Sequence, residues 1–395
     1  MRRGNLAGMP QMFLTTHTGS LPRPADLTPL LQAHQDGAPT PDLDQHVAAA
    51  VEEVVQRQVD AGVDVVNDGE MGKIGYSTYV TDRLTGFEKA PEPTNRPPFD
   101  VAEFPDLQDY LARLSRPILQ AVRYAYSAIC TGDVKARDTQ AVAVQQDIAR
   151  LKTAAATAGA ENLFMSAASS GVVSAFIPDK HYNNHANYVG AIADAMRPEY
   201  RAIVEAGITL QIDCPDLAMV GGRFPSLEDF RTFASTNIEA LNHAVEGLPA
   251  DKMRIHICWG NYEGPHNHDV ELRDIIDIVL RANAAGLSLE ACNPRHAHEW
   301  RVFENTRLPA DRYVVPGVID STNNFVEHPD LVAERLLNYA SVVGAQRVMA
   351  GSDCGFGTVA GVSNVAPSVV WAKFRSMSEG ARRARERVKA PTAAG

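Results

Sequence analysis

Long apolar runs are absent from this 395-residue sequence. No stretch approaches the ~20 consecutive apolar residues that a membrane helix needs. The opening MRRGNLAGMPQM has two arginines but no apolar segment behind them. We therefore expect neither a membrane protein nor an export signal.

Positive charge is also scarce. The chain has 37 Lys and Arg against 48 Asp and Glu, which gives a formal net charge of -11. Binding to nucleic-acid phosphates needs clustered Lys and Arg, and the overall balance is the reverse. The composition therefore argues against a nucleic-acid partner.

Cysteine is rare, with only five residues, at positions 130, 214, 258, 292 and 354. The number is odd, the spacings are wide, and a chain of this size can bury a large core without disulfides. Free thiols in a reducing cytoplasm are the expected state. Such thiols are available to bind a metal.

One local pattern recurs along the chain: a helical segment ending in Gly, a short β-rich run, and then polar residues. It occurs as VDAGVDVVNDGE (59–70), TAGAENLFMSA (157–167), VEAGITLQIDCPD (204–216), ANAAGLSLEACN (282–293) and VVGAQRVMAGSDCG (342–355). We expect a left-handed helix cap at each glycine, namely Gly62, Gly159, Gly207, Gly286 and Gly344. Helices alternating with buried strands predict parallel βα units.

The predicted fold class is α/β, as a single (β/α)8 TIM barrel over residues 1–395. Nine strand candidates lie near 14–18, 63–67, 128–132, 163–167, 208–212, 253–258, 287–291, 313–318 and 347–352. A barrel needs eight, so one candidate, most readily 128–132, either is not a strand or belongs to an insertion. An open doubly wound sheet is the alternative, although no Gly-rich phosphate fingerprint follows the first strand.

An insertion is expected over about 86–125, beginning with the proline-rich FEKAPEPTNRPPFDVAEFP. Proline interrupts helices and strands, so this segment is predicted to be a loop or lid over one end of the barrel. Residues of about 385–395 are expected to be a flexible tail.

The candidate metal ligands follow from the barrel. Working residues of a parallel barrel sit at the carboxyl ends of its strands. His256 and Cys258, in RIHICWG, are two apart on a predicted strand and so point the same way. Glu290 and Cys354 end two later strands, and the four side chains predict a Zn²⁺ site whose carboxylate a substrate thiol can replace.

Other candidates have simpler interpretations. Cys130 and Cys292 are expected to be core residues, and Cys214 is left open. His266 and His268 in GPHNHD could ligate a metal, but Asp269 or Asn267 capping a helix is the favoured interpretation. For RHAHEW we expect His296 or His298 to support ligands instead of binding metal.

A chain of motifs resembles the catalytic half of cobalamin-independent methionine synthase and its single-barrel relatives. The motifs are TTHTGSLPRP (15–24), NDGEMGK (67–73), LQIDCPDLA (210–218), HICWGN (256–261), SLEACNPRHAHEW (288–300), PGVIDSTNNFVEHP (316–329) and GSDCGFGT (351–358). The resemblance implies a (β/α)8 barrel with zinc ligands at His256, Cys258, Glu290 and Cys354. It also implies that Ser20 contacts the substrate carboxylate, while Glu70 and Asp213 hold the substrate amino group.

Three departures from that family stand out. The second barrel of the full-length synthase has no counterpart in these 395 residues, so the methyl donor is open. The synthase has Asp-Glu-Pro where this chain has Asp213, Cys214 and Pro215. A proposed proton-donating histidine of the family is replaced by Thr322, which leaves Asp320 as the nearest titratable group and catalytic candidate, with His328 further along.

The phrases HICWG, AHEWRV and VEHPDLV also resemble epoxyalkane:coenzyme M transferase, in which a zinc-bound thiolate opens an epoxide. Its sulfonate substrate would need a cation, for which Arg23, Lys73 and Arg295 are candidates.

The leading hypothesis is zinc-dependent transfer of a methyl or alkyl group from a small-molecule donor to a small thiol, by preference homocysteine. Coenzyme M transfer is the first alternative. A metal-dependent hydrolase and a non-catalytic zinc module rank lower. A homo-oligomer is left open.

Overall fold

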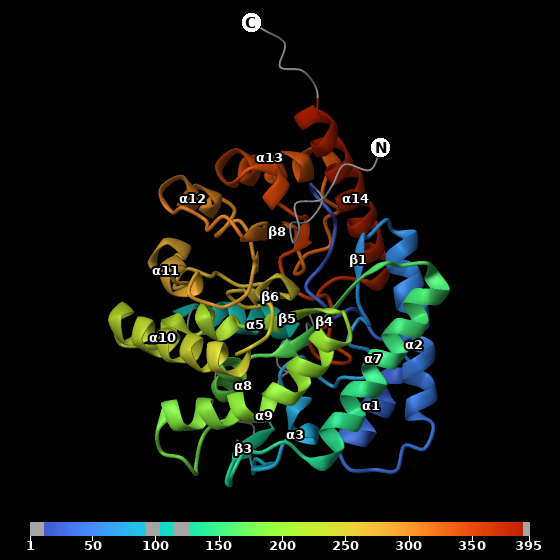
Figure 1. The fold of residues 1–395 in the computed structure, drawn as a ribbon, viewed down its shortest axis with the longest axis vertical. Coiled ribbons are helices and arrows are strands. Elements are labelled where there is room, and N and C mark those ends of the chain that lie inside the picture. The colour runs from blue at the N-terminus through green and yellow to red at the C-terminus, as the bar shows by residue number, and fades with distance from the viewer. Residues whose placement is uncertain (1–11, 92–102, 114–126, 390–395) are drawn as a thin grey trace, which may run out of the picture.

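Parallel strands alternate with helices along the chain, and the strands form the centre of the molecule (Figure 1). The computed structural model describes residues 12–91, 103–113 and 127–389. One parallel sheet runs in the order β1 (Val65–Val66), β4 (Asn162–Ala168), β5 (Thr209–Asp213), β6 (Met253–Ile257), β7 (Gly286–Leu289), β8 (Tyr313–Ile319) and β9 (Gly351–Ser352). Neighbouring strands of this sheet also follow one another along the chain, which is the strand order of a barrel.

The segment around Thr15 closes the barrel. Thr15 forms a parallel bridge with Ala350 beside β9. On its other side, the carbonyl oxygen of Thr15 accepts hydrogen bonds from the backbone N–H groups of Asp64 (3.1 Å) and Val65 (3.0 Å), at the start of β1. The predicted (β/α)8 barrel is thus confirmed, and the short segment around Thr15 takes the place of its eighth strand.

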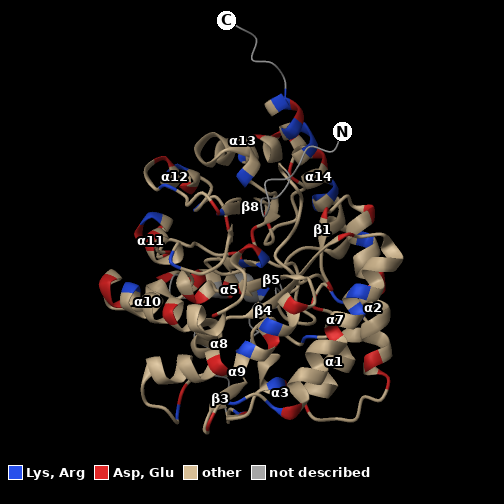
Figure 2. Ribbon diagram, in the orientation of Figure 1, with Lys and Arg blue, Asp and Glu red and all other residues tan. Residues whose placement is uncertain are grey.

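The helices lie around the strands (Figure 1). They are α1 (Leu27–Gln35), α2 (Leu43–Asp60), α3 (Val80–Arg83), α5 (Pro105–Arg113), α7 (Asp138–Ala158), α8 (Ser170–Phe176), α9 (His185–Glu205), α10 (Leu227–Ala244), α11 (Ile276–Val279), α12 (Val302–Asn305), α13 (Pro329–Val343) and α14 (Pro367–Lys389). In α2 the buried face contains Val47, Val51, Val54 and Val55, at the spacing of one helix face. Figure 2 shows acidic and basic residues interspersed on these outer helices.

The strand candidate at 128–132 does form a strand, but it lies outside the barrel sheet, as expected for an insertion. β3 (Ala128–Cys130) pairs antiparallel with β2 (Phe87–Lys89) in a separate two-stranded sheet. Within the predicted lid, the Glu103 carboxylate bonds to Asn267 and His268 at 2.7 Å each, in the loop after β6. The described parts of this predicted insertion, 86–91 and 103–113, contain β2 and α5, so the expectation of an irregular loop is wrong there. The remainder, 92–102 and 114–125, lies outside the described residues.

Two of the five predicted glycine caps are wrong. Gly344 follows α13 with a positive φ of 90°, but its ψ of 134° is not that of a left-handed cap. Gly159 does end α7 in the left-handed conformation, with φ 72°. Gly286 instead begins β7, and a Cβ there would lie 2.5 Å from the Cβ of Arg254 and 2.6 Å from the Tyr313 ring. Close packing inside the barrel, and not a helix cap, therefore requires glycine at this position.

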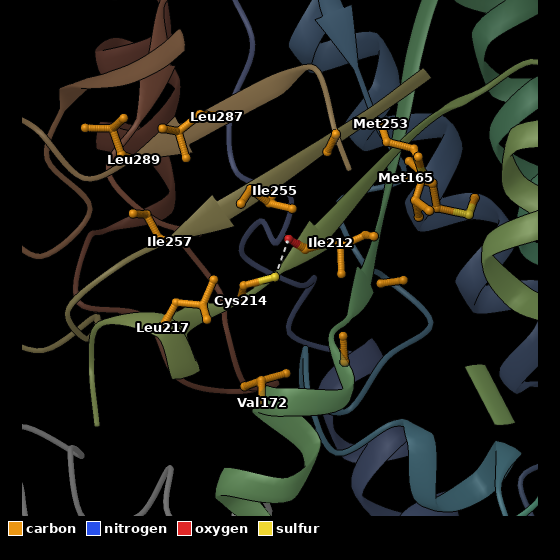
Figure 3. Close-up of a cluster of buried hydrophobic side chains, with 14 of the residues drawn as sticks. Met165, Val172, Ile212, Cys214, Leu217, Met253, Ile255, Ile257, Leu287 and Leu289 are labelled. Atoms are coloured by element: carbon orange, nitrogen blue, oxygen red, sulfur yellow. Dashed lines mark hydrogen bonds between the residues drawn. The ribbon is translucent and has the colours of Figure 1, made fainter. Parts of the chain in front are cut away.

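Apolar side chains of β5, β6 and β7 pack together in the close-up of Figure 3. Cys214 lies among them, next to Ile212 and Leu217, and its thiol contacts the Ile212 carbonyl oxygen at 3.5 Å. Cys130 is also a core residue, as predicted. Cys292 is buried, but its Sγ lies 2.7 Å from Nη1 of Arg335, so its surroundings are polar and not the apolar core that we expected.

Helix α14 extends through part of the predicted tail and ends at Lys389, beyond which residues 390–395 are not described. Across 12–91, 103–113 and 127–389, none of the helices combines the length and apolarity that a bilayer crossing requires.

Candidate metal centre

Three predicted ligands meet at the carboxyl ends of β6 and β9. His256 is the fourth residue of β6, Cys258 follows the end of that strand, and Cys354 comes two residues after β9. Their ligand atoms all lie within 4.8 Å of one another, and all three residues are buried. The two sulfur atoms are 4.0 Å apart. Two thiolates on one tetrahedral ion, each with a metal–sulfur bond of about 2.3 Å, would lie about 3.8 Å apart, so the spacing fits a shared ion.

His256 is prepared to act as a ligand. Its Nδ1 lies 3.1 Å from the Ser288 hydroxyl on the neighbouring strand β7. Its Nε2 is buried and has no hydrogen-bond partner among the residues that the structure describes. Burial, aided by the charge of Arg254, lowers the pKa of His256 to about 3, so the imidazole is neutral. A buried, neutral and unpartnered nitrogen beside two thiols is a donor set that fits a metal ion.

Glu290 is close to this group but is not part of it. One of its oxygens accepts from the backbone N–H of Trp259 at 3.0 Å, and the other from Nδ2 of Asn293 at 2.8 Å. Burial raises the pKa of Glu290, and the charge of His296 opposes that rise. The fourth predicted ligand therefore occupies a hydrogen-bonded position of its own.

Two buried carboxylates lie at the carboxyl ends of β1 and β5, which β4 separates in the sheet. Glu70 follows β1 with φ 57°, and its Oε1 accepts from Ser166 at 2.6 Å while its Oε2 is buried without a partner among the described residues. Asp213 ends β5 and accepts from Gln211 at 2.8 Å. Burial, with the nearby charge of Glu70, raises the pKa of Asp213 to about 8. Because two negative charges on Glu70 and Asp213 would repel each other in this buried place, the pair favours a cationic ligand.

The first loop connects these carboxylates to the metal ligands. A Cβ at Gly19 would lie 2.9 Å from Glu70 Oε1, and a Cβ at Gly355 would lie 1.9 Å from the Ser20 hydroxyl. The N–H of Phe356 donates to the Ser20 carbonyl oxygen at 2.8 Å. Ser20 therefore contacts the segment that follows Cys354.

Asp320 lies in the loop after β8 and is buried. Its Oδ1 accepts from the N–H of Thr322 at 2.5 Å, from the Thr322 hydroxyl at 2.8 Å and from the N–H of Asn323 at 3.2 Å. One carboxylate oxygen is thus engaged in shaping its own loop. His328, the other candidate acid, is exposed and caps the start of α13.

A second group of potential ligands contains Cys292, Asp320 and Asp353. Asp353 accepts from the backbone N–H groups of Ala291, Cys292 and Asn293 at 2.7–2.8 Å. The sequence pattern did not single out this role, although Asp353 immediately precedes Cys354. Asp353 therefore fixes the loop that carries Glu290.

The predicted cations are mostly engaged elsewhere. Arg23 donates to the carbonyl oxygens of Glu70 and Lys73 at 2.9 Å each. Lys73 donates from Nζ to the Ser166 carbonyl oxygen at 2.6 Å, and Arg295 is exposed.

The two histidine motifs form one buried network. Asp269 Oδ2 lies 2.7 Å from Nδ1 of His266 and 3.0 Å from Nε2 of His296. Asp269 therefore joins two histidines and does not cap a helix, because the loop continues past it to a short 3-10 turn at Leu272–Asp274. His268, in contrast, is half exposed beside Glu103.

Comparisons with known proteins find similar sequences and structures. The family described as "Cobalamin-independent synthase, Catalytic domain" matches residues 101–378. A methionine synthase of Saccharolobus solfataricus is 24% identical over 381 residues, covering 95% of this chain and 96% of that protein. A 2-hydroxypropyl-CoM lyase of Xanthobacter autotrophicus is 30% identical over 203 residues, covering 45% of this chain and 51% of that protein. Among solved structures, a B12-independent methionine synthase from Shewanella sp., in complex with selenomethionine, has a TM-score of 0.71 at 19% identity and covers 95% of this chain and 99% of that one.

Proposed function

The chain belongs to the family of the cobalamin-independent synthase catalytic domain, and from this premise we propose that it transfers a methyl or alkyl group to a small thiol at a single zinc ion. Homocysteine is the preferred thiol and methionine the preferred product. The similarity to a methionine synthase over 95% of the chain supports this choice.

The observation that carries the proposal is the buried set of His256, Cys258 and Cys354. Its sulfur atoms lie 4.0 Å apart, and Nε2 of His256 has no hydrogen-bond partner within 12–91, 103–113 and 127–389. Glu290 is the fourth ligand and the one that we expect to exchange with the substrate thiol. Bound zinc would supply a Lewis acid that lowers the pKa of a substrate thiol, so that a thiolate is present at neutral pH. The chain's own part is to hold a neutral imidazole and two thiols in a space from which water is largely excluded.

A thiol is a better nucleophile for this donor set than water. Thiolate ligands leave zinc less acidic, and catalytic zinc sites that activate water draw mainly on His and carboxylate ligands. A hydrolase is therefore the weaker candidate.

Homocysteine suits the two carboxylates near the metal group. The ammonium group of homocysteine can donate charge-assisted hydrogen bonds to both Glu70 and Asp213. Glu70 Oε2 has no partner in the described part of the chain, which leaves an acceptor for such a donor. Ser20, beside the loop of Cys354, is proposed to contact the substrate carboxylate.

Asp320 is proposed to supply the proton to the leaving group, because it is a buried carboxyl in the loop after β8 and its Oδ2 is not the oxygen that holds Thr322 and Asn323.

The second candidate function is alkyl transfer to coenzyme M. The relative that is a 2-hydroxypropyl-CoM lyase, 30% identical over 203 residues, favours it. Arg23 and Lys73 already donate to backbone carbonyl oxygens, but Nε of Arg23 is buried without a partner among the described residues and is a donor that a sulfonate could use.

We further propose that residues 1–395 act as one barrel domain with a lid at about 86–125, and that the protein works in the cytoplasm. The five cysteines are all free, which suits a reducing compartment. The partners are then a small thiol and a small-molecule methyl or alkyl donor.

Calorimetry tests the proposal. Homocysteine is titrated into zinc-loaded and metal-free protein at pH 7 in two buffers of different ionisation enthalpy. Zinc-loaded protein should release about one proton more per homocysteine bound than metal-free protein does, because a free thiol with a pKa of about 8.5 is protonated at this pH. Equal proton release with and without zinc would refute thiol activation by the metal, and release with coenzyme M alone would select the second candidate.

A further inference from the structure

The Glu290 carboxylate lies in a preformed binding site for an anion. Both of its oxygens are hydrogen-bonded, one to the Trp259 N–H and one to Asn293 Nδ2. Among the described residues, the metal-ligand group of His256, Cys258 and Cys354 does not include Glu290. A buried carboxylate outside that group keeps its charge only where donors replace its lost water.

The two donors are held firmly. The Trp259 indole Nε1 donates to the Val270 carbonyl oxygen at 2.6 Å, and the side chain is 1% exposed. The Asn293 backbone N–H donates to Asp353 at 2.7 Å, and its Oδ1 accepts from the N–H of Arg295 at 3.0 Å. Neither donor therefore needs to be ordered when the carboxylate arrives.

The charged ring of His296 lies against the side chain of Trp259. The His296 ring stacks on the Trp259 indole at 3.9 Å between centroids and 19° between planes. Its Nδ1 lies 2.9 Å from Glu299 and its Nε2 3.0 Å from Asp269, so both nitrogens face carboxylate oxygens. Only an imidazolium can donate from both nitrogens at once. In agreement, these carboxylates raise the pKa of His296 to about 9 despite the opposing effect of burial.

We propose that Asn293, the Trp259 N–H and the His296 imidazolium form a resting site for the Glu290 carboxylate when it is off the metal. Asn293 and His296 are thus positioning residues that set how readily Glu290 gives way to a substrate thiol. This inference rests on the proposed function, because it needs a thiol that competes with Glu290. It also gives a role to the RHAHEW motif.

The variant Asn293→Ala removes one donor to the carboxylate. In zinc-loaded protein the Kd for homocysteine, measured by calorimetry, should rise about tenfold, the effect of one lost hydrogen bond to a charged group. The affinity for zinc, measured by chelator competition, should stay unchanged or increase, because Glu290 then favours the metal. In a Glu290→Ala background, Asn293→Ala should change the homocysteine Kd by less than about twofold.

The variant His296→Gln removes the charge and should also raise the homocysteine Kd without weakening zinc binding. His185→Gln is the matched control, because His185 is likewise stacked, on Phe233 at 4.5 Å, and hydrogen-bonded, to Asn237 at 2.7 Å. The control should leave both affinities unchanged.

Two results would overturn the inference alone: wild-type homocysteine affinity in Asn293→Ala, or a parallel loss of zinc affinity that marks general damage to the site. If wild-type zinc-loaded protein itself fails to bind homocysteine, the proposed function fails together with this inference.

Discussion

Cys258 and Cys354 are 96 residues apart in the sequence, yet their sulfur atoms lie 4.0 Å from each other. The barrel produces this proximity, because β6 and β9 present their carboxyl ends at the same rim. The distance is too long for a disulfide, whose sulfur atoms are about 2.05 Å apart, and suits two ligands of one ion.

Replacing either cysteine with serine should remove both metal and activity. For Cys258→Ser and Cys354→Ser we expect zinc affinity to fall by at least about a hundredfold, because a hard hydroxyl replaces a thiolate ligand. Metal content after dialysis measures this. Cys214→Ala is the control, since Cys214 packs in the apolar core; it should keep its zinc and lose about 1 kcal/mol of stability.

Ser288 should affect the affinity for zinc although it is not a ligand. Its hydroxyl lies 3.1 Å from His256 Nδ1, and removal of such a partner loosens the ring that carries the ligand nitrogen. We expect Ser288→Ala to weaken zinc binding about tenfold in a chelator competition. Unchanged affinity would mean that packing alone orients His256.

Glu70 and Asp213 should determine recognition of the amino group. Glu70→Gln removes a negative charge, and Asp213→Asn removes a carboxyl group that can ionise when it meets the substrate ammonium. We expect each to raise the Kd for homocysteine at least about tenfold, as for a lost charge-assisted hydrogen bond. Zinc content should not change. Calorimetry with 3-mercaptopropionate, which lacks the amino group, provides the control, because its binding should not weaken in either variant.

The pH dependence of stability should carry a signature of Asp213. Burial first, and then the charge of Glu70, raises the pKa of Asp213 from 3.8 to about 8. Between these pH values the folded protein holds a proton that the unfolded chain has lost, so this group makes the protein less stable as pH rises. Asp213→Asn cannot ionise, and the free energy of unfolding of the variant relative to wild type should therefore increase from pH 5 to pH 8. Denaturant titrations across this range measure it, and a constant difference would contradict the raised pKa.

The sequence predicted the barrel well, because strands such as β8 are short apolar runs and helices such as α2 have a regular buried face. The spacing of His256 and Cys258 was also readable, since side chains alternate along a strand. Contacts between distant segments were not. Gly286 serves packing against Arg254 and Tyr313, Asp269 joins two histidines from different loops, and Cys292 faces Arg335. Local patterns carry no information about such partners.

The position of Glu290 could not be predicted for the same reason. A residue two strands from Cys354 was expected among the ligands, but the donors that hold it belong to Trp259 and Asn293. The structure is needed to show that Glu290, in the loop after β7, lies near the metal-ligand group but is hydrogen-bonded outside it.

The most direct test of the central claim is spectroscopy of cobalt-substituted protein titrated separately with homocysteine and with coenzyme M. A sulfur-to-cobalt charge-transfer band that changes with homocysteine alone is the predicted result, because the substrate thiol should join the sulfur ligands Cys258 and Cys354 at the metal. A spectrum that neither thiol changes would contradict thiol activation at this site.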